Sequence, residues 1–303
     1  SLTGDGDLLA VGARGEASNS PGIDGDQTND GSTAAGAVYV FERDDAGAWS
    51  QRAYIKSSSP SAYGGFGYEV SLAKDGRSMA VGAFDEAATL FERDDDGVWS
   101  QHAILVASKD PSVGFGTSVS LAGDGRTLAV GNPTDSNGSS GIDPEPTDAH
   151  PSNAGAAYVF VRDDAGVWSQ DVYIKPSNTQ QGDWFGWRVV LSGDGNVLAV
   201  CSPYEDGGSS GIDGDQYDDD YLDSGATYVF VRDEAGAWSQ RSYVKASTVG
   251  WNDYFGVAVS LSTDGRSLVV SGPRETSSAT GIGGDQSDGS VAEAGAGVGD
   301  RRR

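Results

Sequence analysis

The feature that most constrains this chain is its internal repetition. A Phe-Gly pair and a Trp-Ser-Gln triplet each recur four times along the 303 residues. The pairs begin at Phe66, Phe115, Phe185 and Phe255, and the triplets begin at Trp49, Trp99, Trp168 and Trp238. Repetition with a period of tens of residues indicates an array of similar supersecondary units. We therefore divide the chain into units of approximately 1–65, 66–114, 115–184, 185–254 and 255–303, which together are expected to form a single domain.

Each complete unit reads as four short β-strands. In residues 185–254 the runs WRVVLS, VLAVCS, ATYVFVR and WSQRSYVK are rich in Val, Tyr, Phe and Trp and are bounded by Gly, Asp or Ser. Four antiparallel strands repeated in tandem without helices are typical of a β-propeller. The predicted fold is all-β, a β-propeller of four-stranded antiparallel blades with four near-complete repeats plus a half repeat. Both ends of the sequence fall inside a unit, which favours a fragment of a larger propeller.

The recurring aromatic residues are expected to form the core. Along FGYEVSLA, large residues alternate with small ones, so one face of the strand is bulky and the other is mostly small. Stacked blades can fill the small face of one sheet with the bulky face of the next. We expect the Phe-Gly phenylalanines and the Trp-Ser-Gln tryptophans to pack between blades. The glycine after each Phe allows the innermost strands to approach closely.

Charge and composition exclude several classes of function. The formal net charge of −25 repels nucleic acid and anionic membranes. No apolar run is long enough to span a membrane, so no membrane insertion is expected. Cys201 is the only cysteine, and only two histidines are present, which leaves no disulfide and no Cys/His zinc site. Cys201 lies in the apolar run VLAVCSP, where a buried and inert thiol is expected.

Antiparallel connectivity places the variable loops on one face of the predicted blades. The turns between strands one and two and between three and four are tight, whereas the loops between strands two and three and the connections between blades emerge on the other side. Loops gathered on one face of a rigid scaffold are the usual place for binding. We expect a protein or glycan ligand to dock on this loop-rich face.

The long loops carry a repeated acidic motif. GIDGDQ occurs at residues 22–27 and 211–216, and it returns as GIGGDQ at 281–286. Closely spaced oxygen ligands on a glycine-rich loop are suited to Ca²⁺, with backbone carbonyls and water completing the shell. The alternative is that these side chains only shape turns through Asx hydrogen bonds. The candidate Ca²⁺ ligands are Asp24, Asp26, Asn29, Asp213, Asp215, Asp218, Asp285 and Asp288.

Aromatic residues stand in the connections that precede the Phe-Gly pairs. These are Tyr63, Trp184, Trp251 and Tyr254. Exposed Trp and Tyr can stack on sugar rings or anchor a protein partner. Alternatively, each ring folds inward over the neighbouring blade. They are the candidate ligand-binding residues of the loop-rich face.

The ordered motifs resemble a known family. Phe-Gly, Val-Ser-Leu, an Asp-Gly turn, Leu-Ala-Val-Gly, a triplet in the place of Gly-Ala-Pro and Gly-Ala-x-Tyr-Val-Phe resemble the FG-GAP repeats of integrin α-chain propellers and of bacterial surface proteins similar to them. The resemblance covers essentially the whole chain, although no copy of the triplet reads Gly-Ala-Pro in full. It implies a propeller, usually of seven blades, that is extracellular and serves adhesion or ligand binding.

The chain departs from integrins at their calcium loops. At the corresponding turns only one aspartate precedes a glycine, and the other carboxylates of the integrin motif are missing. The family's calcium sites are therefore not carried over to these positions, where turn formation is expected instead. The aspartates concerned are Asp5, Asp75, Asp124, Asp194 and Asp264.

Three functions are consistent with this pattern. The first is a non-catalytic binding or adhesion module, located outside the cell or on its surface. The second is a structural spacer of a surface protein, stiffened by Ca²⁺. The third, less favoured, is a glycan-processing enzyme that relies on pairs of carboxylates. Near-equivalent loops that repeat along the chain favour the first function, so no enzymatic activity and no catalytic residue are expected.

Overall fold

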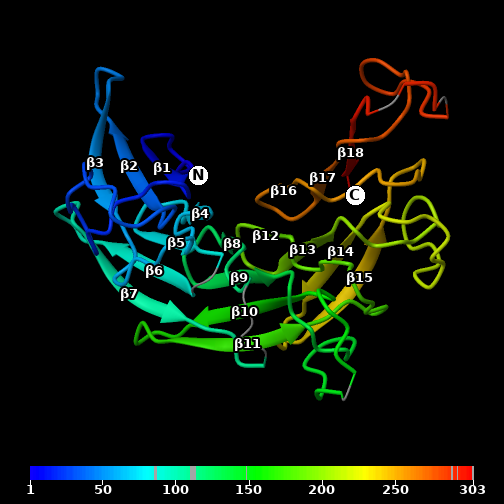
Figure 1. Ribbon diagram of the computed structural model, residues 1–303, viewed down its shortest axis with the longest axis horizontal. Coiled ribbons are helices and arrows are strands. Elements are labelled where there is room, and N and C mark those ends of the chain that lie inside the picture. The colour runs from blue at the N-terminus through cyan, green and yellow to red at the C-terminus, as the bar shows by residue number, and fades with distance from the viewer. Residues whose placement is uncertain (85–86, 110–113, 148, 288, 292, 302–303) are drawn as a thin grey trace. The chain divides into compact units, whose positions relative to one another are not determined.

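The computed structural model describes residues 1–84, 87–109, 114–147, 149–287, 289–291 and 293–301, and the regular elements within these ranges are all β-strands (Figure 1). The strands are β1 (Leu8–Ala13), β2 (Ala37–Arg43), β3 (Trp49–Ile55), β4 (Glu69–Leu72), β5 (Ser78–Gly82), β6 (Ala88–Arg93), β7 (Trp99–Leu105), β8 (Ser118–Leu121), β9 (Thr127–Asn132), β10 (Ala156–Arg162), β11 (Trp168–Ile174), β12 (Arg188–Leu191), β13 (Val197–Ser202), β14 (Ala226–Arg232), β15 (Trp238–Val244), β16 (Val259–Leu261), β17 (Ser267–Gly272) and β18 (Ala296–Arg301).

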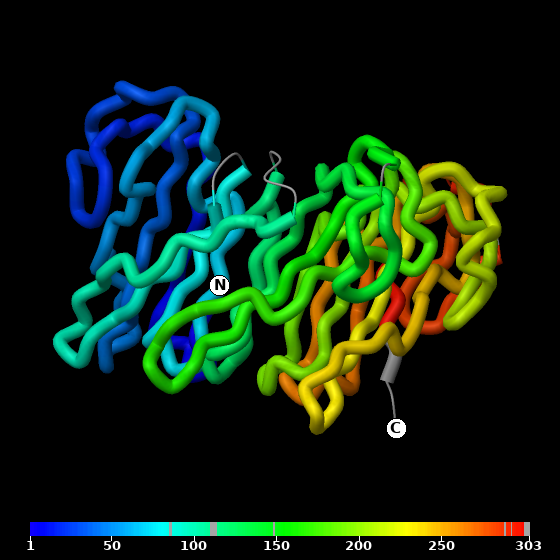
Figure 2. Tube along the Cα trace, turned by 90° about the horizontal axis from the view of Figure 1, so that it is seen from below, coloured from blue at the N-terminus to red at the C-terminus, as the bar shows by residue number. Residues whose placement is uncertain are grey.

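The strands form five sheets in sequence order, which are the blades of a β-propeller. Blade 1 (β1–β3) and blade 5 (β16–β18) have three strands, and blade 2 (β4–β7), blade 3 (β8–β11) and blade 4 (β12–β15) have four. Consecutive strands within a blade are hydrogen-bonded neighbours, and the path of the chain through them is followed in Figure 2. The predicted all-β propeller of small antiparallel blades is confirmed. The half repeat is more complete than expected, because residues 296–301 pair with β17 although their sequence departs from the repeat.

The chain divides into two compact units. Unit 1 comprises residues 1–130 and 159–171, and unit 2 comprises residues 131–158 and 172–303. The division passes through blade 3. The single domain remains a prediction, and the two units are described separately below.

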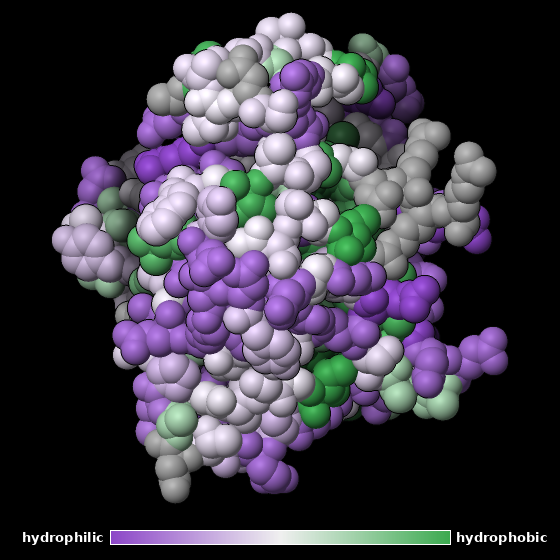
Figure 3. Space-filling view, turned by 90° about the vertical axis from the view of Figure 1, so that its right-hand side faces the viewer, coloured by the Kyte–Doolittle hydropathy of each residue, from purple (hydrophilic) through white to green (hydrophobic). Residues whose placement is uncertain are grey.

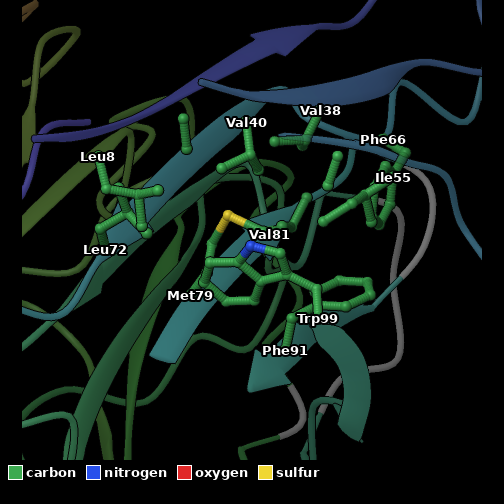
Figure 4. Close-up of a cluster of buried hydrophobic side chains, with 12 residues drawn as sticks. Leu8, Val38, Val40, Ile55, Phe66, Leu72, Met79, Val81, Phe91 and Trp99 are labelled. Atoms are coloured by element: carbon green, nitrogen blue, oxygen red, sulfur yellow. The ribbon is translucent and has the colours of Figure 1, made fainter. Parts of the chain in front are cut away.

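The core of unit 1 lies between blades 1 and 2. Side chains from β1 to β7 point toward one another there, with Leu8, Leu72, Met79 and Trp99 among them (Figure 4). Trp99 is 4% exposed and Trp238 is 8% exposed, as expected for residues that pack between blades. Trp49, in blade 1, is 44% exposed, and the Arg43 guanidinium lies 6.0 Å from its ring centroid. The apolar residues that remain on the side of the molecule in Figure 3 are scattered among hydrophilic ones.

The four Phe-Gly pairs lie in the core, as predicted. All four phenylalanines are buried. Phe66 packs edge-on against Phe91, with ring centroids 6.1 Å apart, and Phe185 meets Phe230 in the same way at 6.2 Å. The following glycine permits close approach of the backbone, since a Cβ on Gly186 would lie 2.1 Å from the Ala156 carbonyl oxygen. Phe66 and Phe185 also pair through their backbones with Gly36 and Gly155, directly before the third strand of the preceding repeat.

The Asp-Gly turns are shaped by their aspartates, as predicted. In each turn the carboxylate accepts a hydrogen bond from the backbone N–H two residues later, which is an Asx turn. In unit 2 the connection between blades 3 and 4 contacts the long loop of blade 4, because Asn178 Nδ2 donates to the Gln216 carbonyl oxygen over 2.7 Å.

Candidate functional site

A buried ion pair anchors the long loop in three blades. The lysine that follows the last strand of the blade, β3, β11 or β15, reaches a carboxylate at the start of the loop. The pairs are Lys56–Glu16 at 2.6 Å, Lys175–Asp135 at 3.0 Å and Lys245–Glu205 at 2.8 Å. Tyr243 Oη also donates to Glu205 Oε1 over 2.7 Å. Blade 2 has a short loop, and at the lysine position it carries Val106, which is 65% exposed. The pair therefore accompanies the long loop and serves to hold it.

The acidic motif is engaged in local structure in the same repeating way. Asp24 and Asp213 have a positive φ, and the Oδ1 of each accepts the backbone N–H of the tyrosine in the last strand of its blade, Tyr54 or Tyr243. The Asp before the Gln of each motif accepts the backbone N–H two residues later, which is an Asx turn. The side chain three residues after that Asp also accepts a backbone N–H of the same loop. Asp26, Asp215 and Asp285 are the Asx residues, Asn29 and Asp218 are the side chains three residues later, and Asp288 lies outside the described residues.

These contacts agree with the alternative that the acidic side chains shape the turns of the loop and bind no Ca²⁺. Within the described ranges, no three His, Cys, Asp or Glu side chains are grouped so that they can hold a metal ion. Carboxylate oxygens that accept backbone N–H groups are already partly satisfied. The Ca²⁺ sites stay a prediction, and a calorimetric or melting test is needed to decide them.

Two of the four candidate aromatic residues come together in unit 2. Trp184 and Tyr254 join Trp187 and Tyr204 in what we call the aromatic cluster. The centroids of Trp184 lie 5.6 Å from Trp187 and 5.3 Å from Tyr204, and Tyr204 lies 5.2 Å from Tyr254. All four rings are half-buried. The cluster joins the inner edge of blade 4 to the connection that enters blade 5.

The other two candidate aromatics lie apart from the cluster. Trp251 is 62% exposed, and its ring packs 6.2 Å from Tyr221. Tyr63 belongs to unit 1 and is 71% exposed. The sequence thus identified two members of the aromatic cluster and two exposed rings outside it.

The backbone of the aromatic cluster adopts a conformation that disfavours bulky residues. The position just before each Phe of the Phe-Gly pairs has a positive φ in all four units. Gly65 and Gly114 occupy it in two units, whereas Trp184 (φ 56°) and Tyr254 (φ 52°) occupy it in the others. A bulky residue in this region is strained by about 1–3 kcal/mol, and such strain is concentrated at functional sites. Trp184 and Tyr254 therefore lower the stability of the fold relative to glycine at the same positions.

Polar groups surround the aromatic cluster. The Arg274 guanidinium lies 4.8 Å from the centroid of Tyr254, and that of Arg188 lies 5.6 Å from Trp187. Nε1 of Trp187 is buried and has no hydrogen-bond partner within the described part of the chain. Buried donors in native proteins nearly always have a partner. The cluster thus offers flat rings, two cations and a free donor in a chain whose net charge is strongly negative.

Carboxyl groups with raised pKa values lie beside the cluster. Burial raises the pKa of Asp206, and the charges of Glu205 and Asp219 add to the rise. Burial and the charge of Asp206 raise the pKa of Asp223. Both residues are half-buried, and Asp206 Oδ1 accepts the backbone N–H of Asp223 over 2.8 Å. Carboxyl groups with raised pKa values in a partly accessible place can act as general acids and bases.

Asp183 is a third carboxyl group with a raised pKa, next to Trp184 in the chain. Burial, followed by the charges of Glu205 and Asp206, raises its pKa to about 8. Its Oδ2 accepts the Gln180 N–H over 3.2 Å, and its side chain is almost fully buried. Asp183 directly precedes Trp184 in the chain. It supports the connection that carries the aromatic ring and is not itself open to a ligand.

Two other features carry no comparable chemistry. The Cys201 thiol is fully buried, which raises its pKa to about 12, so it is inert as expected. A polar hollow on the tight-turn side of unit 1 is lined by Arg52, Arg77 and Arg93. All three guanidinium groups are already paired with carboxylates, at 2.7 to 3.0 Å.

Several residues of the site escaped the sequence reasoning. Tyr204 and Arg274 occupy one repeat position, directly before Glu205 and Glu275, where the first and third units have Gly15 and Thr134. Comparing the units position by position would have marked both as exceptions. The ion pairs had a plainer signal, since the lysine follows its carboxylate by 40 residues in all three cases.

Comparison with known proteins supports the repeat assignment. Residues 99–160 match the family model described as FG-GAP repeat. The FG-GAP resemblance is confirmed. This FG-GAP segment runs from the fourth strand of blade 2 to the third strand of blade 3, and the likeness to integrins in particular stays a prediction. No curated protein matches the sequence.

Solved structures that resemble the chain include proteins described as lactonases. One is a putative 6-phosphogluconolactonase from Bacteroides uniformis, with a TM-score of 0.53, 12% identity and coverage of 94% of this chain and 68% of that one. Another is the periplasmic gluconolactonase PpgL of Pseudomonas aeruginosa, with a TM-score of 0.52, 16% identity and coverage of 89% and 63%. The chain thus spans about two thirds of the length of either protein, and the likeness shows the fold alone.

These comparisons correct the expected function. The prediction of a non-catalytic adhesion module, and with it the prediction of no enzymatic activity, is wrong, because the similar propellers are described as lactonases. The error arose from taking near-equivalent loops as evidence against a single active site. The loops are equivalent in their anchoring, but the aromatic cluster occurs at one place in unit 2.

Proposed function

We propose that the chain belongs to a hydrolase that opens lactones of sugar acids, and that the aromatic cluster binds the sugar ring. The observation that carries the proposal is the presence of Trp184 and Tyr254 at a positive-φ position that is glycine in two other units. Their rings meet Tyr204 beside the raised-pKa pair Asp206 and Asp223. The descriptions of the similar propellers support the choice of a lactone as substrate.

Binding relies on rings and cations. Aromatic faces stack on the apolar faces of sugars. Arg274 is about half exposed, lies over Tyr254 and has its Nε 3.7 Å from Glu293 Oε1. Because this exposed pair is long, the guanidinium can turn to an anionic substituent such as a carboxylate or a phosphate. These contacts orient the lactone carbonyl toward Asp223.

The reaction requires one general base and one proton donor. Asp223 takes a proton from water as the water oxygen bonds to the lactone carbonyl carbon. The bond from that carbon to the ring oxygen then breaks, and the ring oxygen receives a proton. The product is the open hydroxy acid, so one water is consumed. Asp206 is the neighbouring carboxyl group that can supply that proton, because burial and the charges of Glu205 and Asp219 raise its pKa.

Location and partners follow from the same proposal. The periplasmic description of one similar propeller favours a place outside the cytoplasm. No helix in the described part of the chain is long and apolar enough to cross a membrane. The sugar lactone takes the place of the expected glycan ligand, while a protein ligand and the exclusion of nucleic acid stay predictions.

The proposal is tested by measuring acid release from gluconolactone and from its 6-phosphate. Lactones also hydrolyse spontaneously, so the rate is compared with that of heat-denatured protein at equal concentration. We expect saturable hydrolysis above the spontaneous rate with at least one of the two substrates. Equal rates for native and denatured protein with both substrates contradict the proposal.

A further inference from the structure

Trp251 and Tyr221 form a pair of rings at the surface of unit 2, outside the aromatic cluster. Trp251 is 62% exposed and Tyr221 is half-buried, and their ring centroids lie 6.2 Å apart with 54° between the ring planes. We call this pair the surface platform. A tryptophan that lies mostly in water and packs on a second ring presents a flat apolar face to a ligand.

The two rings stand at facing positions of the repeat, and the other long-loop units have different residues there. Trp251 lies four residues before the Phe of its Phe-Gly pair, and Tyr221 lies five residues before β14. The counterparts are Ala62 and Ser32 between blades 1 and 2, and Gln181 and Pro151 between blades 3 and 4. The backbone contact beside the rings recurs in all three places, as from the Asn252 N–H to the Leu222 carbonyl oxygen over 2.9 Å. The scaffold is therefore shared, whereas the pair of rings occurs at one of the three places.

Asp206 joins the surface platform to the proposed catalytic pair. Its carbonyl oxygen accepts the Tyr221 N–H over 3.0 Å, and its Oδ1 accepts the Asp223 N–H over 2.8 Å. The Tyr254 N–H donates to the Asp223 carbonyl oxygen over 3.1 Å. Trp251 precedes Tyr254 by three residues, so their Cα atoms are at most about 11 Å apart. The surface platform thus lies beside the aromatic cluster, within reach of a second ring joined to the first.

Carboxylates border the surface platform. A Cβ on Gly208 would lie 2.9 Å from Asp218 Oδ2 and 3.0 Å from Tyr221 Cδ2, so this carboxylate stands next to the ring. Asp220, directly before Tyr221, is exposed. Carboxylates accept hydrogen bonds from hydroxyl groups and repel phosphate and carboxylate groups. Rings among carboxylates also attract cations, which makes a cationic peptide the competing occupant.

We propose that the surface platform binds a second, uncharged sugar ring, so that the substrate is the lactone of a disaccharide acid. This inference rests on the proposed function. The lactone ring lies on the aromatic cluster, and the added sugar stacks on Trp251 while its hydroxyl groups donate to Asp218 or Asp220. Continuity with the proposed site through Asp206 favours a sugar over a cationic peptide.

The second ring is tested with two stable acids, gluconate and lactobionate, which is gluconate joined to a galactose. Calorimetric titration of the full chain measures both dissociation constants, and their ratio isolates the added sugar. We expect lactobionate to bind about fivefold to tenfold more tightly than gluconate, because contact with an aromatic face contributes a factor of this order. In Trp251→Ala the two constants should be equal. Trp251→Phe keeps a flat ring and should keep most of the difference.

The control is Tyr63→Ala, which removes an exposed aromatic residue of unit 1 and should leave the ratio at the wild-type value. Circular dichroism checks that each variant is folded. Equal constants in the wild type, no measurable binding of lactobionate, or an undiminished ratio in Trp251→Ala overturns the proposal. A trilysine peptide is titrated in parallel. If it binds to the wild type and not to Trp251→Ala, while lactobionate has no advantage, the surface platform belongs to a cationic partner instead.

These binding ratios do not depend on the hydrolysis assay. If lactone hydrolysis does not exceed the spontaneous rate while the ratio falls in Trp251→Ala as expected, the proposed reaction is wrong and the second sugar site stands. If hydrolysis is observed and the ratio is one in the wild type, the reaction stands and the second sugar site is wrong.

Discussion

Lys245 Nζ lies 2.8 Å from the Glu205 carboxylate, and both side chains are at most 2% exposed. Two charges are thus withdrawn from water at the junction of the fourth strand with the long loop that precedes the third. The ion pair holds the long loop to the last strand of blade 4. The two ends of this loop carry Tyr204, Asp206 and Asp223. Stability and the geometry of the proposed active site are therefore linked in blade 4.

Removing one partner of this pair should destabilise unit 2. Lys245→Met leaves the Glu205 carboxylate buried without its cation, and we expect a loss of about 3–5 kcal/mol in the free energy of unfolding. Urea denaturation followed by circular dichroism measures this loss. Lys74→Met, at an exposed turn, is the matched control and should change stability by about 0.5 kcal/mol or less. Equal effects of the two substitutions would show that the pair does not support the fold.

Asp183 should make the fold less stable as pH rises. Its pKa of about 8 in the folded chain exceeds the ordinary value of an aspartate. A raised pKa contributes stability that is fully present below about pH 4, where the unfolded chain is also protonated, and that is lost as the pH rises to about 8. In Asp183→Asn this loss is absent. The variant should gain on the order of a few kcal/mol over the wild type between pH 4 and pH 9.

The pH effect is measured from urea midpoints of both proteins across this range. Asp233→Asn, in an exposed turn, serves as the control for the general change in charge. A constant stability difference between Asp183→Asn and the wild type at all pH values would contradict a raised pKa at this site.

Replacing Trp184 by glycine should separate binding from folding. The substitution relieves the strain of a positive φ, about 1–3 kcal/mol, and removes ring contacts worth about 0.5–1.5 kcal/mol each. We therefore expect a change in unfolding free energy of about 1 kcal/mol or less, together with a KM for the lactone raised about tenfold. Tyr63→Gly alters a positive-φ aromatic residue of unit 1 and should leave KM unchanged. A large loss of stability with an unaltered KM would assign Trp184 to packing alone.

The acidic loop gives a test of the calcium prediction. Asp213 Oδ1 accepts the Tyr243 N–H over 3.1 Å, so Asp213→Ala should lower the unfolding free energy by about 1 kcal/mol. If the residue only shapes the loop, the loss is the same in millimolar Ca²⁺ and in a chelator. We expect this equality, because the neighbouring carboxylates are also engaged in turns. A melting temperature that Ca²⁺ raises in the wild type but not in Asp213→Ala would instead establish the cation site.

Much of the fold was predictable because the chain repeats its own signals. Phe185 and Phe255 occupy equivalent positions in their repeats, and the Phe of the recurring Phe-Gly pair is buried in each of them. The Asx turns at Asp75 and Asp194 were predictable for the same reason. Each of these features depends on residues close in sequence, so local patterns were sufficient.

The candidate site was only partly predictable because it depends on departures from the repeat. Trp184 and Tyr254 stood out as aromatic residues in connections, but their meeting through Tyr204 joins segments 20 to 50 residues apart. The pKa shifts of Asp206 and Asp223 depend on burial, which a polar loop sequence does not reveal. The repeated Asp-rich motif was predicted to bind Ca²⁺ because it recurs, whereas its described residues accept hydrogen bonds that hold the long loops in place.

The most direct test of the account is kcat/KM for gluconolactone hydrolysis, after subtraction of the spontaneous rate, in the wild type and in Asp223→Asn. Loss of a general base typically lowers the rate by 10²–10⁴, so we expect a fall of at least about a hundredfold, with Asp233→Asn at the wild-type value. The wild-type rate should also rise with pH through a pKa above the ordinary range of an aspartate, because the base must be ionised. Equal activity in Asp223→Asn and the wild type would contradict the proposed site.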